Sequence, residues 1–357
     1  MTIIIAEAGV NHNGDEELAY SLVHAAVKAG ADIIKFQTFR AEELTTQHAQ
    51  QADYQTKNSN LDESQLEMLK KLELSDETFL KIKLACDDLG IGFMSTAFDS
   101  RSLNFLVKTI GVDTLKVPSG EITNAPLILE HAITGKDIIL STGMSNIDEI
   151  RNALSVIAFG YASSSAELVL DKSFEKFFKS KAAQEFLKNK VTLLHCTSEY
   201  PAPLEDLNLN AMHTLADEFN LQIGYSDHSL GIEVPIAAVA MGAKIIEKHF
   251  TLDKAMEGPD HRASIEPQEL ERMIESIRNV DLALGSSEKK IQTSELKNLS
   301  IVRKSIVAVD AICPGEVLSE ANIGIKRPGT GVSPFKYWDY LGKKSKNAYQ
   351  AGDLIDE

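Results

Sequence analysis

The chain has 357 residues, of which 43% are hydrophobic and 25% are charged, and its formal net charge is −16 at pH 7. Its length exceeds that of one typical domain, and its composition is that of an ordinary globular protein with a sizeable core. The acidic balance argues against a nucleic acid or an anionic membrane surface as partner, because either requires a broad basic surface.

The N-terminal segment, residues 1–14, contains a short apolar run without a basic leader and is turn-like from residue 9. We therefore expect a first strand there and not a signal peptide. No apolar run reaches the roughly 18 residues of a membrane span. The cysteines, Cys86, Cys196 and Cys313, lie far apart and do not suggest a disulfide framework. These features predict a cytoplasmic protein.

A short β-branched run, a polar turn and a helical pattern alternate from residue 2 to about residue 283. Residues 15–30 are typical of the helical segments, because their apolar positions fall on one helix face. Eight such units predict an α/β fold, a parallel (β/α)₈ TIM barrel, with a doubly wound sheet as the alternative. The predicted strands are residues 2–9, 32–38, 91–98, 113–120, 137–144, 191–197, 221–227 and 243–250.

Each predicted strand begins with apolar residues and ends in polar or ionisable ones. In a parallel barrel the carboxyl ends of all strands share one face, where barrel enzymes have their active sites. A single polar strand end is ordinary at a junction with a loop, but eight together favour a site on that face. The polar ends comprise Glu7, Lys35, Gln37, Ser95, Thr96, Lys116, Ser119, Ser141, Thr142, His195, Ser226, Asp227, His228, Glu247, Lys248 and His249.

His228 and His249 close the seventh and eighth predicted strands, which are neighbours in a barrel. Two imidazoles on adjacent strand ends can bind one metal ion and leave coordination positions open for water and a substrate oxygen. Two histidines without a third ligand are equally compatible with ordinary polar contacts. The residues alone leave both interpretations open.

Lys35, Lys116 and the turns at 118–121 and 141–144 suggest an anion site, because glycine and serine let backbone N–H groups approach a phosphate or carboxylate. Glu7 and Glu121 are the carboxylates best placed for proton transfer. We expect a glutamate among lysines and a metal ion to keep a low pKa and to serve as an acceptor or base; simple ion pairing with a lysine is the alternative role. Tyr200 and Asp260 follow the sixth and eighth strands on loops where substrate hydroxyls could be held.

Two segments lie outside the repeat. Residues 161–190 form a helical insertion with Phe174, Phe177 and Phe178 on one face, and we assign it to packing or subunit contact. The predicted division of the chain is a barrel domain at 1–284, a polar linker at 285–300 and a small Gly- and Pro-rich β domain at 301–357.

Nine ordered segments, which span nearly the whole chain, resemble those of the sialic acid synthase family, the phosphoenolpyruvate-dependent synthases of nonulosonic acids. Residues 301–357 look like the family's antifreeze-like domain, also called SAF. Ser198 and Ala97 depart from the pattern, standing where several members carry Asn and Pro. The nine segments are IAEAGVNHNG, KFQTF, KVPSGEITN, LSTGM, HCTSEYPAP, GYSDH, EKHFTLD, GPDH and KRPGTG.

The resemblance implies a metal-dependent condensation of phosphoenolpyruvate with an N-acetylmannosamine-type sugar, which releases phosphate. It implies Mn²⁺, with Mg²⁺ or Co²⁺ as alternatives, held by His228 and His249, and proton transfer by Glu7 and Glu121. Matching positions for phosphoenolpyruvate are Lys35, Thr96, Lys116, Ser119, Ser141 and Ser226; those for the acceptor sugar are Gln37, Tyr200, Asp260 and Arg327.

Arg327 matches an arginine that the small domain delivers to the partner subunit's site, so the resemblance also implies a domain-swapped homodimer. The acceptor that the resemblance implies is 2,4-diacetamido-2,4,6-trideoxymannose, giving N,N'-diacetyllegionaminate, or N-acetylmannosamine, giving N-acetylneuraminate, and Glu199 slightly favours the former. Another phosphoenolpyruvate-dependent 2-keto-3-deoxy acid synthase and a catalytically silent binding protein are the alternatives. The first would need a second phosphate site for an aldose phosphate, and the sequence offers no spare basic cluster for one.

Overall fold

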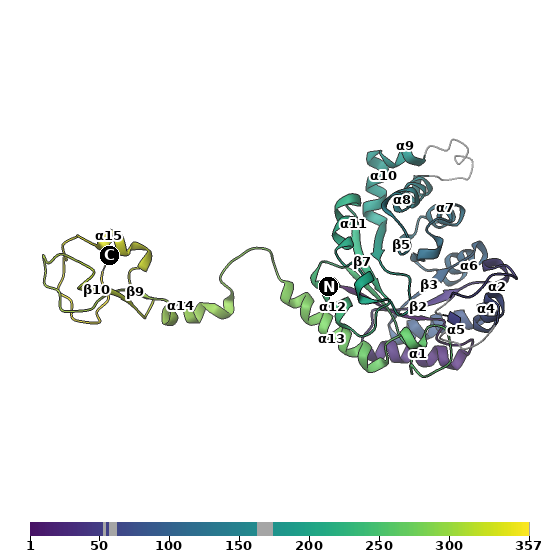
Figure 1. Ribbon diagram of the computed structural model, residues 1–357, viewed down its shortest axis with the longest axis horizontal. Coiled ribbons are helices and arrows are strands. Elements are labelled where there is room, and N and C mark those ends of the chain that lie inside the picture. The colour runs from purple at the N-terminus through teal and green to yellow at the C-terminus, as the bar shows by residue number, and fades with distance from the viewer. Residues whose placement is uncertain (53–54, 57–62, 163–173, 357) are drawn as a thin grey trace. The chain divides into compact units, whose positions relative to one another are not determined.

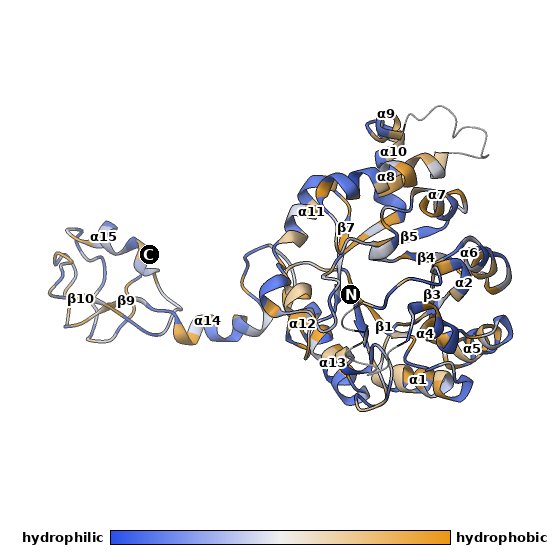
Figure 2. Cartoon of the chain, turned by 45° about the vertical axis from the view of Figure 1, so that its right-hand side comes forward, coloured by the Kyte–Doolittle hydropathy of each residue, from blue (hydrophilic) through white to orange (hydrophobic). Residues whose placement is uncertain are grey.

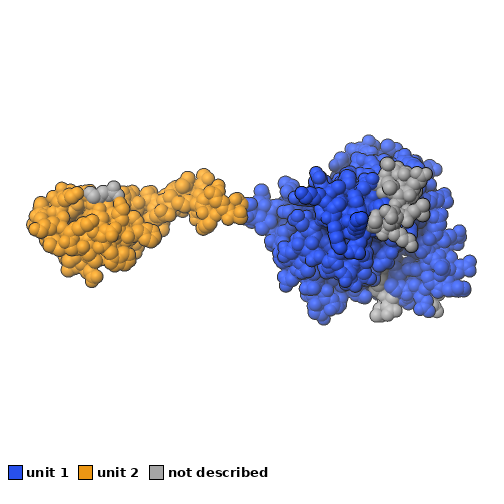
Figure 3. Space-filling model, turned by 90° about the horizontal axis from the view of Figure 1, so that it is seen from above, with its two compact units in different colours: residues 1–285 blue, residues 286–357 orange. Residues whose placement is uncertain are grey.

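The computed structural model describes residues 1–52, 55–56, 63–162 and 174–356. The chain divides into two compact units, Met1–Gly285 and Ser286–Glu357 (Figure 3). In the described part of the chain, no helix is both long and apolar enough to cross a membrane.

The first unit is a closed barrel of eight parallel strands in sequence order (Figure 1). The pairing of β1 with β8, which aligns Glu7 with His249, closes the sheet. The predicted (β/α)₈ barrel is therefore confirmed, and the doubly wound alternative is wrong. The strands are β1 (Ile3–Gly9), β2 (Ile33–Thr38), β3 (Gly92–Ala97), β4 (Thr114–Val117), β5 (Asp137–Ser141), β6 (Val191–His195), β7 (Gln222–Asp227) and β8 (Ile245–His249).

Helices surround the strands, and each carries both hydrophobic and hydrophilic residues (Figure 2). Helix α1 (Glu16–Ala29) begins where the Asp15 side chain accepts a hydrogen bond from the Leu18 N–H, and it ends at Gly30 in the left-handed conformation. The other α-helices among the described residues of this unit are α2 (Ala41–Leu44), α4 (Gln65–Leu72), α5 (Asp76–Leu89), α6 (Ser100–Phe105), α7 (Ala125–Ile133), α8 (Ile147–Ala162), α9 (Phe174–Phe178), α10 (Lys181–Lys190), α11 (Ala211–Phe219), α12 (Glu233–Ala240) and α13 (Pro267–Leu284).

The barrel interior has an apolar layer and an ionisable layer. Successive inward-facing residues of a strand are two apart, so Ile5 is followed inside by Glu7, and Ile245 by Glu247. Each step toward the carboxyl ends therefore leads from the apolar layer into polar side chains. The apolar layer is a buried cluster of Ile5, Met94, Ile139, Leu194 and Ile245.

Part of the predicted 161–190 insertion, residues 163–173, lies outside the described residues. The remainder forms α9 and α10. The rings of Phe174 and Phe177 pack edge-on against Phe159 of α8, with centroid distances of 4.8 Å and 6.3 Å. This insertion therefore contacts the outer helical layer.

The second unit contains an antiparallel pair of short strands, β9 (Ser305–Ala308) and β10 (Ile323–Lys326), and two helices, α14 (Leu296–Val302) and α15 (Tyr337–Tyr340). It has its own core, which consists of Ile306, Ala308, Ile312, Leu318, Ile323, Val332, Tyr349 and Ile355.

Candidate active site

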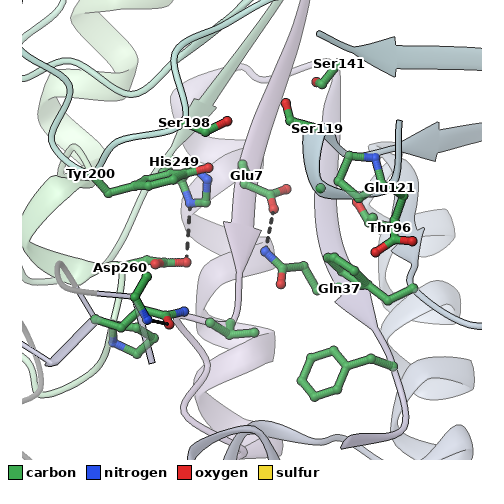
Figure 4. A pocket seen from close by; sticks show the side chains of 18 of the residues that line it. Glu7, Gln37, Thr96, Ser119, Glu121, Ser141, Ser198, Tyr200, His249 and Asp260 are labelled. Carbon is green, nitrogen blue, oxygen red and sulfur yellow. Dashed lines mark hydrogen bonds and ion pairs between the residues drawn. The ribbon is translucent and has the colours of Figure 1, made fainter. Parts of the chain in front are cut away.

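A cavity of about 460 Å³ opens at the carboxyl ends of the strands. All the predicted site residues of the barrel unit line it, and the labelled side chains in Figure 4 converge on it from several strands and loops. Arg327 belongs to the second unit, where it is exposed and its Nε donates a hydrogen bond to the Val302 carbonyl at 3.0 Å. The lining residues that the sequence predicted are Glu7, Lys35, Gln37, Thr96, Lys116, Ser119, Glu121, Ser141, Tyr200, Ser226, His228, His249 and Asp260.

The floor of the cavity is a buried row of alternating charges. The Lys35 ammonium lies 2.9 Å from Glu7 and 3.5 Å from Glu247, and the Lys116 ammonium lies 4.0 Å from Glu247. Each of these side chains is at most 5% exposed. Buried charges require partners, and the alternation supplies each ammonium with a carboxylate.

Glu247 was missing from the predicted site residues. Its signal was available, because a residue two positions before His249 on the same strand faces the same interior. The Ser226 hydroxyl donates a hydrogen bond to Glu247 at 2.9 Å, which adds to the ion pairs with Lys35 and Lys116. Glu247 therefore acts as a fixed anion that spaces the two lysines.

The two carboxylates of the row differ in pKa. Burial raises the pKa of Glu7 to about 7, against the opposing effect of Lys35. The low pKa expected for a glutamate beside both lysines and a metal ion stays a prediction. Burial also disfavours ionised Glu247, but Lys116 and Lys35 outweigh it and lower the pKa of Glu247 to about 2. Near neutral pH, Glu7 can thus hold or release a proton while Glu247 stays ionised.

The lysines respond differently to the same environment. Burial lowers the pKa of Lys116. Burial acts in the same direction on Lys35, but Glu247 and Glu7 outweigh it, and the net effect raises the pKa of Lys35. Lys116 Nζ donates to the Ser141 hydroxyl at 2.7 Å, and Lys35 Nζ donates to Thr96 at 3.1 Å. These bonds orient both ammonium groups at the cavity floor.

The predicted small-residue turns meet beside Lys116. The Gly143 N–H donates to the Ser119 hydroxyl at 3.0 Å. A Cβ at Gly143 would lie 2.3 Å from the Ser198 hydroxyl and 2.8 Å from that of Ser119. Only glycine allows this approach of three loops, and it brings polar groups of both turns to the lysine side of the cavity.

His228 and His249 also face one another across this cavity, with their ring centroids 5.6 Å apart. His228 Nδ1 lies 2.6 Å from the Thr197 carbonyl, which can only accept, so Nδ1 carries the proton and Nε2 keeps its lone pair. Metal-binding histidines are commonly fixed in this way by a backbone carbonyl. Burial lowers the pKa of His228 to about 4 and that of His249 well below its usual value, so both rings are neutral.

A second feature of the His228–His249 pair that fits a metal ion is a buried ring nitrogen of His249. His249 Nδ1 is buried and has no hydrogen-bond partner within the described residues, although Asp260 Oδ2 lies 3.9 Å away. Such an orphaned nitrogen is expected to have an unseen partner. Among the residues that the structure describes, no group of three or more His, Cys, Asp or Glu side chains forms a metal site. The histidines thus form a two-ligand, open arrangement.

The predicted sugar-contact residues lie beside the histidines. The centroid of the Tyr200 ring lies 4.1 Å from that of His228 and 5.4 Å from that of His249. Figure 4 shows Tyr200 beside His249. Burial raises the pKa of Asp260 to about 6. Glu121, which is half-buried, accepts a hydrogen bond from Asn124 Nδ2 at 2.7 Å. The lysine row and the histidines adjoin within this cavity, because the Ser226 hydroxyl donates to Glu247 and lies 3.4 Å from His228 Nε2.

A fully buried ion pair stands behind the histidines. Lys248 and Asp227, both 0% exposed, pair at 2.5 Å on the strand faces opposite the cavity. Lys248 also donates to the Ser229 carbonyl, and the Ser229 hydroxyl donates to Asp227 at 2.8 Å. Each partner is a chain neighbour of one histidine, His228 or His249, so the pair fixes the adjacent strand ends.

We expect Lys248→Met to lower the free energy of unfolding by about 3–5 kcal/mol, because Asp227 would remain as a buried charge without its partner. Urea denaturation followed by circular dichroism measures this loss. Lys81→Met, which removes two exposed pairs, with Glu16 and Glu77, is the matched control and should cost about 1 kcal/mol or less. Equal losses in the two variants would contradict a structural role for the buried pair.

Known proteins resemble this chain over nearly its whole length. The NeuB family model matches residues 22–289, and the SAF domain model matches residues 303–357. The chain is 46% identical to the N,N'-diacetyllegionaminic acid synthase of Campylobacter jejuni, covering 100% of this chain and 99% of that protein. It is 45% identical to the protein of the same name from Legionella pneumophila, covering 99% and 92%.

One solved structure with a similar fold is a crystal structure from Leptospira borgpetersenii, described as N-acetylneuraminic acid (sialic acid) synthetase in complex with citrate. Its TM-score is 0.66 and its sequence identity is 36%, with 83% of this chain and 90% of that chain covered. The likeness thus extends to three-dimensional structure.

Proposed function

The chain belongs to the NeuB family and carries a SAF domain, and from this membership we propose that it condenses phosphoenolpyruvate with a mannosamine-type sugar to form a nonulosonic acid and phosphate. The two N,N'-diacetyllegionaminic acid synthases, at 46% and 45% identity, favour N,N'-diacetyllegionaminate as the product over N-acetylneuraminate. The corresponding acceptor is 2,4-diacetamido-2,4,6-trideoxymannose.

The observation that carries this proposal is one cavity that holds both two buried ammonium groups and two neutral imidazoles. Phosphoenolpyruvate has a phosphate and a carboxylate, and Lys35 and Lys116 can each attract one anionic group. Thr96, Ser119, Ser141 and Ser226 add hydroxyl groups around the lysines. Preorganised donors of this kind stabilise the departing phosphate, and the loss of one is expected to cost about 10²-fold or more in rate.

His228 and His249 would hold the divalent ion that the proposal includes, with Mn²⁺ preferred over Mg²⁺ or Co²⁺. Such an ion supplies Lewis-acid polarisation of the acceptor's aldehyde oxygen. Two features of the chain suit the binding of such an ion: burial keeps both imidazoles neutral, and the Thr197 carbonyl fixes the tautomer of His228.

The proposed condensation forms a bond between C3 of phosphoenolpyruvate and the aldehyde carbon. Water adds at C2, and the C–O bond to phosphate then breaks to leave the 2-keto acid. The aldehyde oxygen gains one proton, which Glu7, with a pKa of about 7, donates in this proposal. Water loses two protons: the half-buried Glu121 accepts the first when water adds at C2, and the departing phosphate takes up the second when the C2 hydroxyl becomes the keto group.

Gln37, Tyr200 and Asp260 are assigned to the acceptor sugar, because they line the cavity near the histidines and Glu7. Arg327 is assigned to the acceptor site of the other subunit in a domain-swapped homodimer. A cytoplasmic location is part of the same proposal and agrees with three free cysteines.

The test is incubation of the protein with phosphoenolpyruvate, Mn²⁺ and each candidate sugar in turn. We expect one phosphate and one 2-keto acid for each molecule of the diacetamido sugar consumed, with no turnover after addition of a chelator. Aldose phosphates serve as the comparison for other 2-keto-3-deoxy acid synthases. Absence of phosphate release with both mannosamine derivatives would refute the proposed function.

A further inference from the structure

Part of the cavity lining is a group of apolar side chains, in contrast to the charged floor, with Gln65 of α4 beside them. We call this group the apolar wall and define it as Val10, Phe39, Leu44, Met68, Leu69 and Leu72. These residues follow β1 and β2 or belong to α2 and α4, whereas His228 follows β7 and His249 is the last residue of β8. The elements that carry the apolar wall are therefore not the ones that carry His228 and His249.

The apolar wall is a built feature with its own small core. Its residues form a hydrophobic cluster separate from that of the barrel, and Met68 and Leu72 are only 4% and 6% exposed. The ring of Phe39 packs edge-on against Phe98 at 6.2 Å. Tight packing of this kind holds side chains in one arrangement.

Helix α4 is anchored at both ends. A capping box between Ser64 and Glu67 begins it. Beyond its end, Glu73 accepts hydrogen bonds from the Arg40 guanidinium at 2.8 Å and from the Ala41 N–H at 3.1 Å. These bonds join the end of α4 to the start of α2, so they fix the position of the wall residues of α4 relative to those of α2.

The two candidate acceptors differ in what they can offer to such a wall. The diacetamido sugar has a methyl group at C6 and an acetamido group at C4, where N-acetylmannosamine has two hydroxyl groups. Aliphatic and aromatic side chains cannot replace the water bonds of a hydroxyl, but they pack against methyl groups. The charged floor and the histidines can contact only the groups that both sugars share, so these residues do not distinguish one sugar from the other.

We propose that the apolar wall is the specificity element of the acceptor site and selects the 6-deoxy, 4-acetamido sugar through its methyl groups. This inference rests on the proposed function. Adding or removing one such group at an apolar surface changes kcat/KM by about 10- to 200-fold. A preference of about 10²-fold for the diacetamido sugar is therefore expected.

Met68→Gln tests the wall, because it keeps the side-chain length and adds a polar amide. We expect the ratio of kcat/KM between the diacetamido sugar and N-acetylmannosamine to fall about tenfold or more, while the KM for phosphoenolpyruvate stays unchanged. Met68→Leu, which keeps the wall apolar, should keep the preference. Leu80→Gln, at an exposed position of α5 outside the cavity, is the matched control.

Leu44→Gln, at a half-buried position of the wall, is the second variant if Met68→Gln does not fold. A ratio that stays constant in the variants, or a wild-type protein that prefers N-acetylmannosamine, overturns the wall's role and leaves the synthase activity standing. Absence of turnover with either sugar in the wild type overturns both. Equal loss with both sugars would indicate a structural effect alone and also contradicts the proposal.

Discussion

His228→Ala and His249→Ala are each expected to lower kcat/KM for the condensation by about 10³-fold or more. Each variant removes one of the two imidazoles, and in the described part of the chain these two do not belong to a group of three or more potential metal ligands. The fold should remain, because both rings face a cavity and not the packed core. Steady-state assays at saturating Mn²⁺ measure the loss.

Calorimetric titration with Mn²⁺ in the absence of substrates separates metal binding from catalysis. The wild-type protein should bind one ion, and each variant should bind it much more weakly. His213→Ala, at an exposed position of α11, is the control and should bind the ion as the wild type does. Unchanged titration curves in the His228 and His249 variants would remove the basis for a metal site at this pair.

The barrel and the direction of its active face could be predicted from sequence because both depend on local pattern. Each strand reads as a short apolar run, and its last inward position carries the functional side chain, as Glu7 and His249 do. Chain order alone makes β7 and β8 neighbours, so the adjacency of His228 and His249 also followed. These predictions required no knowledge of distances.

What could not be predicted depends on distances between strands. The role of Glu247 follows from its separation of 3.5 Å and 4.0 Å from two lysines on other strands. The raised pKa of Glu7 follows from complete burial, whose effect exceeds that of an ion pair at 2.9 Å. Neither quantity is present in a strand's own residue pattern.

The apolar wall was missed for a related reason. Helix α4 lies within the long connection between β2 and β3, and its periodicity indicates only that one face is buried. Whether Met68 and Leu72 face a core or a cavity depends on where that connection folds back over the barrel. Loop-borne residues of this kind commonly determine specificity in barrel enzymes.

Arg327→Ala chains and His228→Ala chains, each inactive alone, are expected to recover about a quarter of wild-type activity when equal amounts are co-assembled. No arginine is found among the described residues that line the cavity, although its ligands are anionic or polar. The exposed Arg327, directly after β10, is the candidate to fill that gap from a second subunit. Activity assays after joint refolding, or after co-expression and purification, measure the recovery.

The expected fraction follows from symmetry. Random pairing makes half of the dimers mixed, and in a mixed dimer one barrel has His228 and receives Arg327 from its partner while the other barrel has neither. Co-assembly of Arg327→Ala with the double variant Arg327→Ala/His228→Ala is the control, and it should recover nothing because neither chain can supply the arginine. Recovery in this control, or none in the first mixture, would contradict delivery of Arg327 across the dimer. If Arg327 acted within its own chain, every barrel in the first mixture would lack either Arg327 or His228, and no activity would return. A quarter of the activity can return only if the two domains of one site come from different chains.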